Sequence, residues 1–476
     1  MNVPLLLLIA VPFIGGLLVI FPGRFLKVLR WIFSLLTVLG TALLLAINFV
    51  GGTKPGFNLW HVMGSANLQQ FSVSPITLVI GAAFVFLWLI VILYSFGYFP
   101  KGGEADTEYY SLTLFMLGST LGLLFANDLI FLYLFWEIAA ITTWRLVGFE
   151  RTQKVISIAT KTIIITFFGS ALMLVGFVIL VTDFGSFNLG DMISSQMPVL
   201  AGVFILAGIF AKSAVIPLYI WLPDAHPAAP SPMSALLSGV IVKIGLIVYL
   251  KMFVQTFSVT TGFCIAVLVI VIVSSLVAGG VALIEKDCKR ILAYSTISQV
   301  AFIFGGLVVV TQIAGSVGGV LYLVAHCLAK GALFLGYGVV VKETGKRNIK
   351  EVGRLVARFP LLFVGVMIAT LSIIGLPPFL GFFAKIDVIF GVLGLVDIVH
   401  QPTHRILLGF GFILASVLTL LYMLRLFSSV FLTGEKPQEG LKEPVYLSVL
   451  VLLLSLSLVG GSVALKPLVA YLAGGG

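Results

Sequence analysis

The chain consists of long apolar runs separated by short polar segments. A helix needs roughly 20 predominantly apolar residues to cross a bilayer, and by that measure the sequence predicts about 14 spans. The predicted fold class is therefore an all-α polytopic membrane protein. The spans are expected at residues 4–21, 29–50, 75–98, 110–126, 129–148, 158–181, 199–226, 233–253, 263–284, 291–310, 315–341, 360–396, 406–431 and 445–469.

The composition agrees with this pattern. Of the 476 residues, 60% are hydrophobic and 10% are charged, and the mean hydropathy is +1.20. Soluble domains carry about 25% charged residues, so a soluble globular class is excluded. The first apolar run has neither a basic segment before it nor a small-residue cleavage site after it. We therefore expect it to be retained as a membrane span and not to be removed as a signal peptide.

The basic residues of the predicted loops are distributed unevenly between the two membrane faces. When the first loop is placed in the cytoplasm, most of the loop lysines and arginines fall on the cytoplasmic side. The opposite side holds only Lys54, Lys251, Arg405 and Lys466. The positive-inside rule then predicts an even number of spans, with both termini on the outer face. This topology accounts for the net charge of +10, so no nucleic-acid partner is indicated.

The sequence carries no recognisable motif for metal, haem or nucleotide chemistry. HExxH, GxGxxG and P-loop patterns are absent from it. The three cysteines, Cys264, Cys288 and Cys327, lie far apart and show no CxxC or Cys/His ligand spacing. We expect them to be small buried hydrophobic residues, and we expect no metal and no cofactor in this chain.

The most unusual stretch runs from residue 204 to residue 243. It carries Lys212 inside an apolar helix, then Pro217 and Pro223, and then a second apolar helix that contains Lys243. A lysine near the centre of a membrane helix costs about 2.5–3.5 kcal/mol, and such residues mark ion pathways by default. The prolines predict a broken helix whose freed backbone groups line protein or a cavity. Together these features predict an ion path.

Glu137 is the only acidic residue that the pattern places near the centre of a span. Its nearest candidate partners by depth are Lys212 and Lys243. A buried lysine holds its proton less tightly than in water, and a nearby carboxylate strengthens that hold. A movement of Glu137 would therefore switch Lys212 between holding and releasing a proton. The alternative is a static ion pair that only holds two helices together.

Other titratable residues extend this predicted path. His326 lies four residues before Lys330, so the two share one helix face, and a histidine suits proton transfer because its ordinary pKa is about 6.5. The alternative for His326 is a packing role. Lys385 is a further deep lysine. Three other basic residues lie near span ends and are expected to reach the interface: Arg145, Lys161 and Arg425.

His226 and Asp224 lie together in the broken segment. We expect this pair at the cytoplasmic rim. There it would form either a proton entrance or a loop cap.

A weak internal repeat relates two of the spans. The span at 199–226 carries Lys212 before its proline break, and the span at 360–396 carries Pro377 and Pro378 before Lys385. These are the seventh and the twelfth span, five positions apart, so the copies would have opposite orientations, an arrangement typical of transporters with discontinuous helices. The predicted organisation is spans 1–3 (1–108), a first repeat unit (109–256), a second, inverted unit (257–432) and a final span (433–476).

Five runs of this sequence resemble the proton-conducting membrane transporter family. They are FWEIAAITTW (135–144), KSAVIPLYIWLPDAHPAAPSPMSALLSGVIVKIG (212–245), DCKRILAYSTISQ (287–299), HCLAKGALFL (326–335) and GLPPFLGFFAK (375–385). That family comprises antiporter-like subunits of respiratory complex I, of Mrp-type cation/proton antiporters and of membrane-bound hydrogenases. The resemblance covers roughly the fourth to the thirteenth span in order.

The resemblance implies a polar axis along the membrane centre. Its members here would be Glu137, Lys212, Lys243, His326, Lys330 and Lys385. Tyr219 stands where many relatives have a histidine, which puts a proton-loading role at this position of the predicted rim in doubt. The chain stops soon after the last predicted span, so it resembles the shorter members that lack a long lateral helix.

From the resemblance we expect a subunit that translocates protons, with exchange for sodium left open. It would work in the plasma membrane of a prokaryote beside other membrane subunits, including further antiporter-like ones. The first candidate complex is a redox-driven pump of the complex I or hydrogenase type, with iron–sulfur, nickel-iron or flavin centres only in partner subunits. This chain would then be the ion-translocating subunit of a multisubunit oxidoreductase. The alternatives are an Mrp-type Na+/H+ antiporter without redox chemistry and a structural scaffold.

Overall fold

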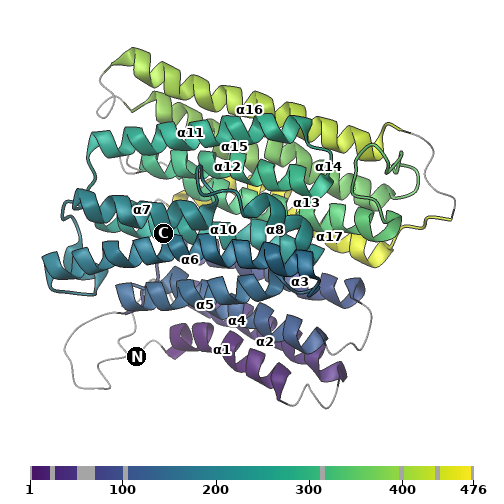
Figure 1. Ribbon diagram of the computed structural model, residues 1–476, viewed down its shortest axis with the longest axis horizontal. Coiled ribbons are helices and arrows are strands. Elements are labelled where there is room, and N and C mark those ends of the chain that lie inside the picture. The colour runs from purple at the N-terminus through teal and green to yellow at the C-terminus, as the bar shows by residue number, and fades with distance from the viewer. Residues whose placement is uncertain are drawn as a thin grey trace. The chain divides into compact units, whose positions relative to one another are not determined.

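The computed structural model describes residues 3–21, 27–50, 70–99, 105–310, 317–395, 401–434 and 440–472. These residues are almost entirely helical (Figure 1), and the β-type pairings among them are isolated bridges. A helix satisfies all its backbone hydrogen bonds internally, which a bilayer requires of any span that is not part of a closed barrel. The prediction of an all-α polytopic membrane protein is confirmed.

Each predicted span coincides with a helix or a pair of helices. Among the described residues, ten helices are long and apolar enough to cross a membrane, and three shorter apolar ones are Leu5–Ile20, Val199–Ser213 and Pro360–Ile374. The predicted last span, 445–469, differs because it divides into α17 (Val445–Val463) and α18 (Leu465–Leu472). Pro467 explains the division, since proline and the residue before it resist a continuous helix.

Contacts between residues divide the chain into two compact units. Unit 1 comprises Met1–Ser213 and Val240–Val259, and unit 2 comprises Ala214–Gly239 and Thr260–Gly476. The chain therefore leaves unit 1 inside the predicted seventh span and returns inside the eighth. The predicted division into four parts and the inverted relation between the repeats stay predictions.

Unit 1 is built by helices that pack mostly on their neighbours in sequence, from α1 against α2 and α4 to α6 against α7. Glycines let α6 and α7 approach closely: a Cβ on Gly208 would lie 2.8 Å from the carbonyl oxygen of Gly169. Small residues at such contacts are how membrane helices pack without a hydrophobic driving force. The helices of this unit are α1 (Val3–Ile20), α2 (Lys27–Val50), α3 (Pro75–Tyr98), α4 (Ala105–Phe125), α5 (Leu129–Val147), α6 (Gln153–Phe184), α7 (Val199–Ser213) and α10 (Val242–Tyr249).

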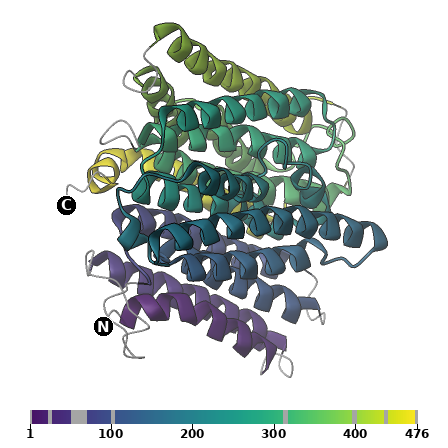
Figure 2. The same ribbon diagram turned by 60° about the vertical axis from the view of Figure 1, so that its left-hand side comes forward.

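Unit 2 is organised around α13 (Gly318–Thr344). Every residue of α13 from Gly318 to Val340 is buried, and the helix contacts α9, α12, α14, α15 and α17. The long helices α11 and α16 lie side by side (Figure 2). The other helices of this unit are α8 (Leu222–Ala228), α9 (Ser231–Leu236), α11 (Thr261–Ile284), α12 (Cys288–Val310), α14 (Pro360–Ile374), α15 (Leu380–Leu393) and α16 (Pro402–Phe431).

Both predicted helix breaks are present. The predicted seventh span divides into α7 and α8, and the twelfth divides into α14 and α15. α14 ends at Gly375, whose φ of +88° suits glycine, and the amides of Gly375 and Leu376 both donate to the carbonyl of Leu371. The Ile216–Pro217 and Pro377–Pro378 peptide bonds are cis.

Three of the four basic residues predicted for the outer face lie in helices. Arg405 belongs to α16 and Lys466 to α18. Lys251 belongs to the π-helical segment Leu250–Thr256, which prolongs α10, and it is 4% exposed. Lys54 lies outside the described residues. The assignment of these residues to the outer face stays a prediction.

Candidate ion path

The first part of the candidate path is the carboxylate of Glu137 on α5. Asp128 starts this helix by accepting hydrogen bonds from the amides of Ile130, at 2.9 Å, and Phe131, at 3.4 Å. Glu137 lies well inside α5, with a half-buried side chain and a buried Oε1 that accepts no hydrogen bond from the described residues. The hydroxyl of Tyr133, one turn earlier, interacts with the Glu137 carboxylate.

Lys212 lies in the last turn of α7, just before the break. Its side chain is 1% exposed, and its Nζ lies 5.5 Å from the centre of the Trp136 ring. Glu137 and Lys212 are close enough to interact electrostatically, yet no nitrogen–oxygen contact of 4.0 Å or less joins them in the described part of the chain. The structure therefore brings the two predicted partners together without a tight ion pair.

Lys243 is completely buried on α10, in the same unit. The hydroxyl of Ser213, next to Lys212, donates a 3.0 Å hydrogen bond to the carbonyl of Val242. Gly245 allows this approach, because a Cβ there would lie 2.8 Å from the carbonyl oxygen of Ile209. This hydrogen bond thus joins the C-terminal end of α7, at the helix break, to the turn of α10 that carries Lys243.

In unit 2, His326 and Lys330 are both completely buried on α13. The Nζ of Lys330 donates hydrogen bonds to the Ser295 hydroxyl, at 2.7 Å, and to the Leu292 carbonyl, at 3.1 Å. The rings of His326 and Tyr322 have their centres 6.1 Å apart. Tyr322, His326 and Lys330 are spaced by four residues, so they form one polar stripe along α13.

Lys385 lies one turn into α15, after the second break, and is 3% exposed. Its Nζ donates hydrogen bonds to the carbonyls of Ile373, at 2.8 Å, and Ile374, at 3.4 Å. The same atom lies 4.6 Å from the ring centre of Phe302 and 5.6 Å from that of Tyr322. The ammonium group thus binds the open C-terminal end of α14, where a helix dipole favours positive charge.

Sequence reasoning missed a buried network centred on Gln299 of α12. The Gln299 Nε2 donates to the Thr419 hydroxyl at 2.7 Å and to the Tyr422 hydroxyl at 3.1 Å. The Tyr322 hydroxyl donates to the Gln299 Oε1 at 2.5 Å. A glutamine inside a predicted span is the available signal, since a buried amide in a bilayer has to find partners. Through Tyr322 this network reaches both His326 and Lys385.

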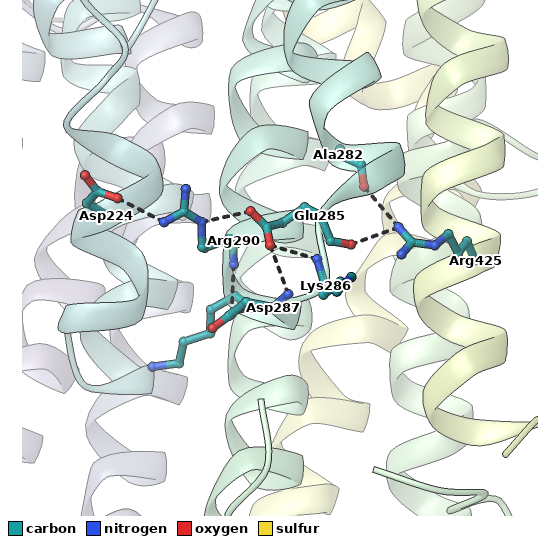
Figure 3. Close-up of polar contacts among 8 residues, drawn as sticks. Asp224, Ala282, Glu285, Lys286, Asp287, Arg290 and Arg425 are labelled. Atoms are coloured by element: carbon teal, nitrogen blue, oxygen red, sulfur yellow. Dashed lines mark hydrogen bonds and ion pairs between the residues drawn. The ribbon is translucent and has the colours of Figure 1, made fainter. Parts of the chain in front are cut away.

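The predicted rim residues occupy different surroundings. Asp224 is partly exposed and pairs with Arg290 at 3.1 Å, and Arg290 also pairs with Glu285 at 2.9 Å (Figure 3). His226 is completely buried and stacks on Phe334, with ring centres 4.2 Å apart. Tyr219 is partly exposed in the segment between α7 and α8. Any role of these three in proton entrance stays a prediction.

The side chains of Arg425 and Arg145 each bind groups near the end of a helix. Arg425 donates to the carbonyls of Leu283, at 2.5 Å, and Glu285, at 2.9 Å, at the C-terminal end of α11. Figure 3 shows its contacts with the carbonyls of Ala282 and Glu285. Arg145 forms an ion pair with Glu108. Cations placed at the last carbonyls of a helix stabilise it. These contacts agree with the expected position of both arginines near span ends.

Comparison with known proteins identifies the family. The family described as "NADH:quinone oxidoreductase/Mrp antiporter, TM" matches residues 126–401. The chain belongs to this family. All six predicted path residues, from Glu137 to Lys385, lie within the part that matches.

Relatives of this family include proteins named Na(+)/H(+) antiporter subunit A1. The chain is 34% identical over 390 residues to the one from Staphylococcus haemolyticus. The aligned part covers 76% of this chain and 48% of that protein. For the Staphylococcus aureus protein, the identity is 33% over 388 residues, with the same coverage. The chain thus spans about half the length of the curated relatives it matches.

Solved structures of two membrane complexes share the fold. A chain of the Mrp complex from Dietzia sp. DQ12-45-1b matches with a TM-score of 0.83 and 21% identity, over 100% of this chain and 97% of that chain. A chain of the archaeal membrane-bound sulfane sulfur reductase matches with a TM-score of 0.83 and 23% identity, over 99% and 97%. These two likenesses concern the fold alone.

The described residues hold no group of three or more His, Cys, Asp or Glu side chains arranged to bind a metal. The three cysteines are buried and none forms a disulfide.

Proposed function

We propose that this chain is an antiporter-like membrane subunit that translocates protons through the half-buried Glu137 and the buried residues Lys212, Lys243, His326, Lys330 and Lys385. Sodium is the counter-ion proposed for exchange. Membership of the family supports this function, and so do its relatives, which are named as Na(+)/H(+) antiporter subunits.

The relation between Glu137 and Lys212 carries the proposal. A lone carboxylate and a lone ammonium in the membrane interior gain most from a direct, hydrogen-bonded ion pair. Here the two interact at longer range, and the Lys212 ammonium lies over the face of Trp136. A pair held apart in this way is one that a small movement would strengthen or weaken. Such a movement would change how tightly Lys212 holds its proton, which is the elementary step of a proton path.

The curated relatives favour an Mrp-type Na+/H+ antiporter as the parent complex. The second candidate is a redox-driven membrane complex, because the description of the family names NADH:quinone oxidoreductase beside the Mrp antiporter. In that case the electron-carrying centres would belong to partner subunits, and energy would reach this chain from them. Loss of a sodium-dependent pH change in cells without this gene, with respiration unchanged, would select the first candidate.

We also propose that both termini face the outside of a prokaryotic plasma membrane. The excess of basic residues in alternate loops supports this orientation. Fusion of a reporter that is active only in the cytoplasm to the C-terminus should give no signal. A strong signal from that fusion would overturn the proposed orientation.

Ion uptake by inverted membrane vesicles that contain the whole complex tests the proposed function. The decisive variant is Glu137→Gln, compared with native protein with and without sodium. We expect the complex to assemble and proton transport to fall by at least tenfold. Glu351→Gln is the matched control, since Glu351 is exposed in a loop and the same charge is removed. Transport and assembly that both survive in Glu137→Gln would refute the path.

Lys212→Ala separates the path from a structural scaffold. If Lys212 works in proton transfer, the variant complex assembles and is uncoupled. If Lys212 only holds helices together, the complex fails to assemble. Quantitative immunoblotting of purified complexes distinguishes the two results.

A further inference from the structure

The break between α14 and α15 brings together backbone carbonyls and hydroxyls, groups that bind cations. A helix end leaves its last carbonyls without intrahelical partners. At the end of α14, the carbonyls of Ile373 and Ile374 accept hydrogen bonds from the Lys385 ammonium. Carbonyls at broken helix ends coordinate sodium in membrane transporters, so the position held here by an ammonium group is chemically suited to a metal cation.

Two buried hydroxyls lie in the same last turns of α14. Ser372 and Thr370 are each 1% exposed, and within the described ranges neither hydroxyl oxygen has a hydrogen-bond partner. The Ser372 hydroxyl faces the break, because a Cβ on Gly381 of α15 would lie 3.0 Å from it. An unsatisfied buried hydroxyl is costly, and a cation bound beside it would supply the missing partner.

Aromatic rings form another side of the site. The Lys385 Nζ lies 4.6 Å from the ring centre of Phe302 and 5.6 Å from that of Tyr322, distances at which a cation is attracted by a ring face. The Tyr322 ring is held in place by the 2.5 Å hydrogen bond to Gln299. The groups that contact the Lys385 ammonium are thus neutral carbonyls and ring faces, which suit one positive charge at a time.

We propose that the end of α14 is a site for a small monovalent cation such as Na+, for which Lys385 is an internal competitor. The inference rests on the proposed function and assigns the exchanged cation a place. When Na+ binds the carbonyls of Ile373 and Ile374 with the Ser372 hydroxyl, the Lys385 ammonium leaves them.

Other titratable groups lie around this site and must be considered in any pH dependence. Tyr322 on α13 faces Lys385 directly, and His326 lies one turn further along the same helix. Asp387 on α15 lies against Gly318 of α13, where a Cβ would be 3.0 Å from its own Cβ. Packing places Phe302 of α12 and the carbonyls of α14 on the remaining sides.

Thermal unfolding of the purified full chain in NaCl, compared with choline chloride at equal concentration, tests the site. Lys385→Ala removes the competitor, so we expect a Na+-dependent rise in Tm that is larger than in native protein. Ser372→Ala added to Lys385→Ala should raise the half-saturating Na+ concentration about tenfold, equivalent to about 1.4 kcal/mol. Lys330→Ala is the matched control, because its ammonium also binds a carbonyl and a hydroxyl but within continuous helices. An equal response in Lys330→Ala, or none in Lys385→Ala, overturns the proposal.

Native protein provides a readout that does not depend on a variant folding. The Tm of native protein should be higher in NaCl than in choline chloride at equal concentration. Equal Tm values in the two salts would contradict the cation site.

The results for the two variants distinguish an error in the proposed cation site from an error in the proposed function. If Lys385→Ala shows no Na+ response while Glu137→Gln abolishes transport, the cation site is wrong and the proton path stands. If Lys385→Ala responds to Na+ while Glu137→Gln transports normally, the site stands and the proposed path falls.

Discussion

The hydroxyl of Tyr322 on α13 donates a 2.5 Å hydrogen bond to the side-chain oxygen of Gln299 on α12. Both residues are completely buried. The centre of the same tyrosine ring lies 5.6 Å from the Lys385 Nζ and 6.1 Å from the centre of the His326 ring. One contact between neighbouring helices therefore positions the surroundings of two predicted path residues.

Tyr322→Phe should destabilise the protein by about 1–3 kcal/mol, because the buried oxygen of Gln299 loses its donor. Chemical denaturation in detergent measures the free energy of unfolding. Tyr337→Phe is the matched control: Tyr337 lies on the same helix, is equally buried, and its hydroxyl has no hydrogen-bond partner among the described residues. Equal losses in the two variants would show that the bond to Gln299 contributes nothing.

Glu285, between α11 and α12, should make stability depend on pH. Burial raises the pKa of its carboxyl, but hydrogen bonds from the amides of Lys286 and Asp287 and the nearby Arg290 guanidinium outweigh burial and hold the pKa below its ordinary 4.5 (Figure 3). A lowered folded-state pKa stabilises the protein above the unfolded value, and this contribution is lost as pH falls through the folded value.

Thermal unfolding of native protein and Glu285→Gln between pH 7 and pH 3 checks this expectation. The difference in Tm should be largest at neutral pH and should shrink as the solution becomes acidic. Glu351→Gln, which removes an exposed carboxylate, should show a small and nearly constant difference. A Glu285→Gln difference that does not change with pH would refute the assignment.

Gly208→Ala should weaken the packing of α6 on α7. The new Cβ would lie 2.6 Å from the Cβ of Met173 and 2.8 Å from the carbonyl oxygen of Gly169, so the helices must separate. Overpacking of this kind costs about 1–3 kcal/mol. Gly262→Ala on α11 is the control, since its Cβ would meet no atom within 4 Å. Equal denaturation midpoints for the two variants would contradict a close α6–α7 contact.

Most of the helical architecture was predictable from the sequence. A bilayer permits few backbone arrangements, so runs of about 20 apolar residues translate directly into helices. The breaks at Pro217 and Pro377 were predictable for a local reason, the missing amide hydrogen of proline. The burial of Lys251 was not, because whether a lysine near a span end is buried depends on which helices surround it.

The sequence by itself determined that this is a polytopic helical membrane protein with charged residues inside its spans at Glu137, Lys212, Lys243, Lys330 and Lys385. These properties follow from residue type and spacing, which act locally on the chain. Only the tertiary structure decided what those charges contact. The Lys212 Nζ lies over the Trp136 ring, Lys330 donates to the Ser295 hydroxyl, and Lys385 donates to the Ile373 carbonyl at the end of α14. The Gln299 side chain bonds Thr419, far along the sequence. Such contacts depend on which helix faces meet, and helix packing is a property of the folded chain as a whole.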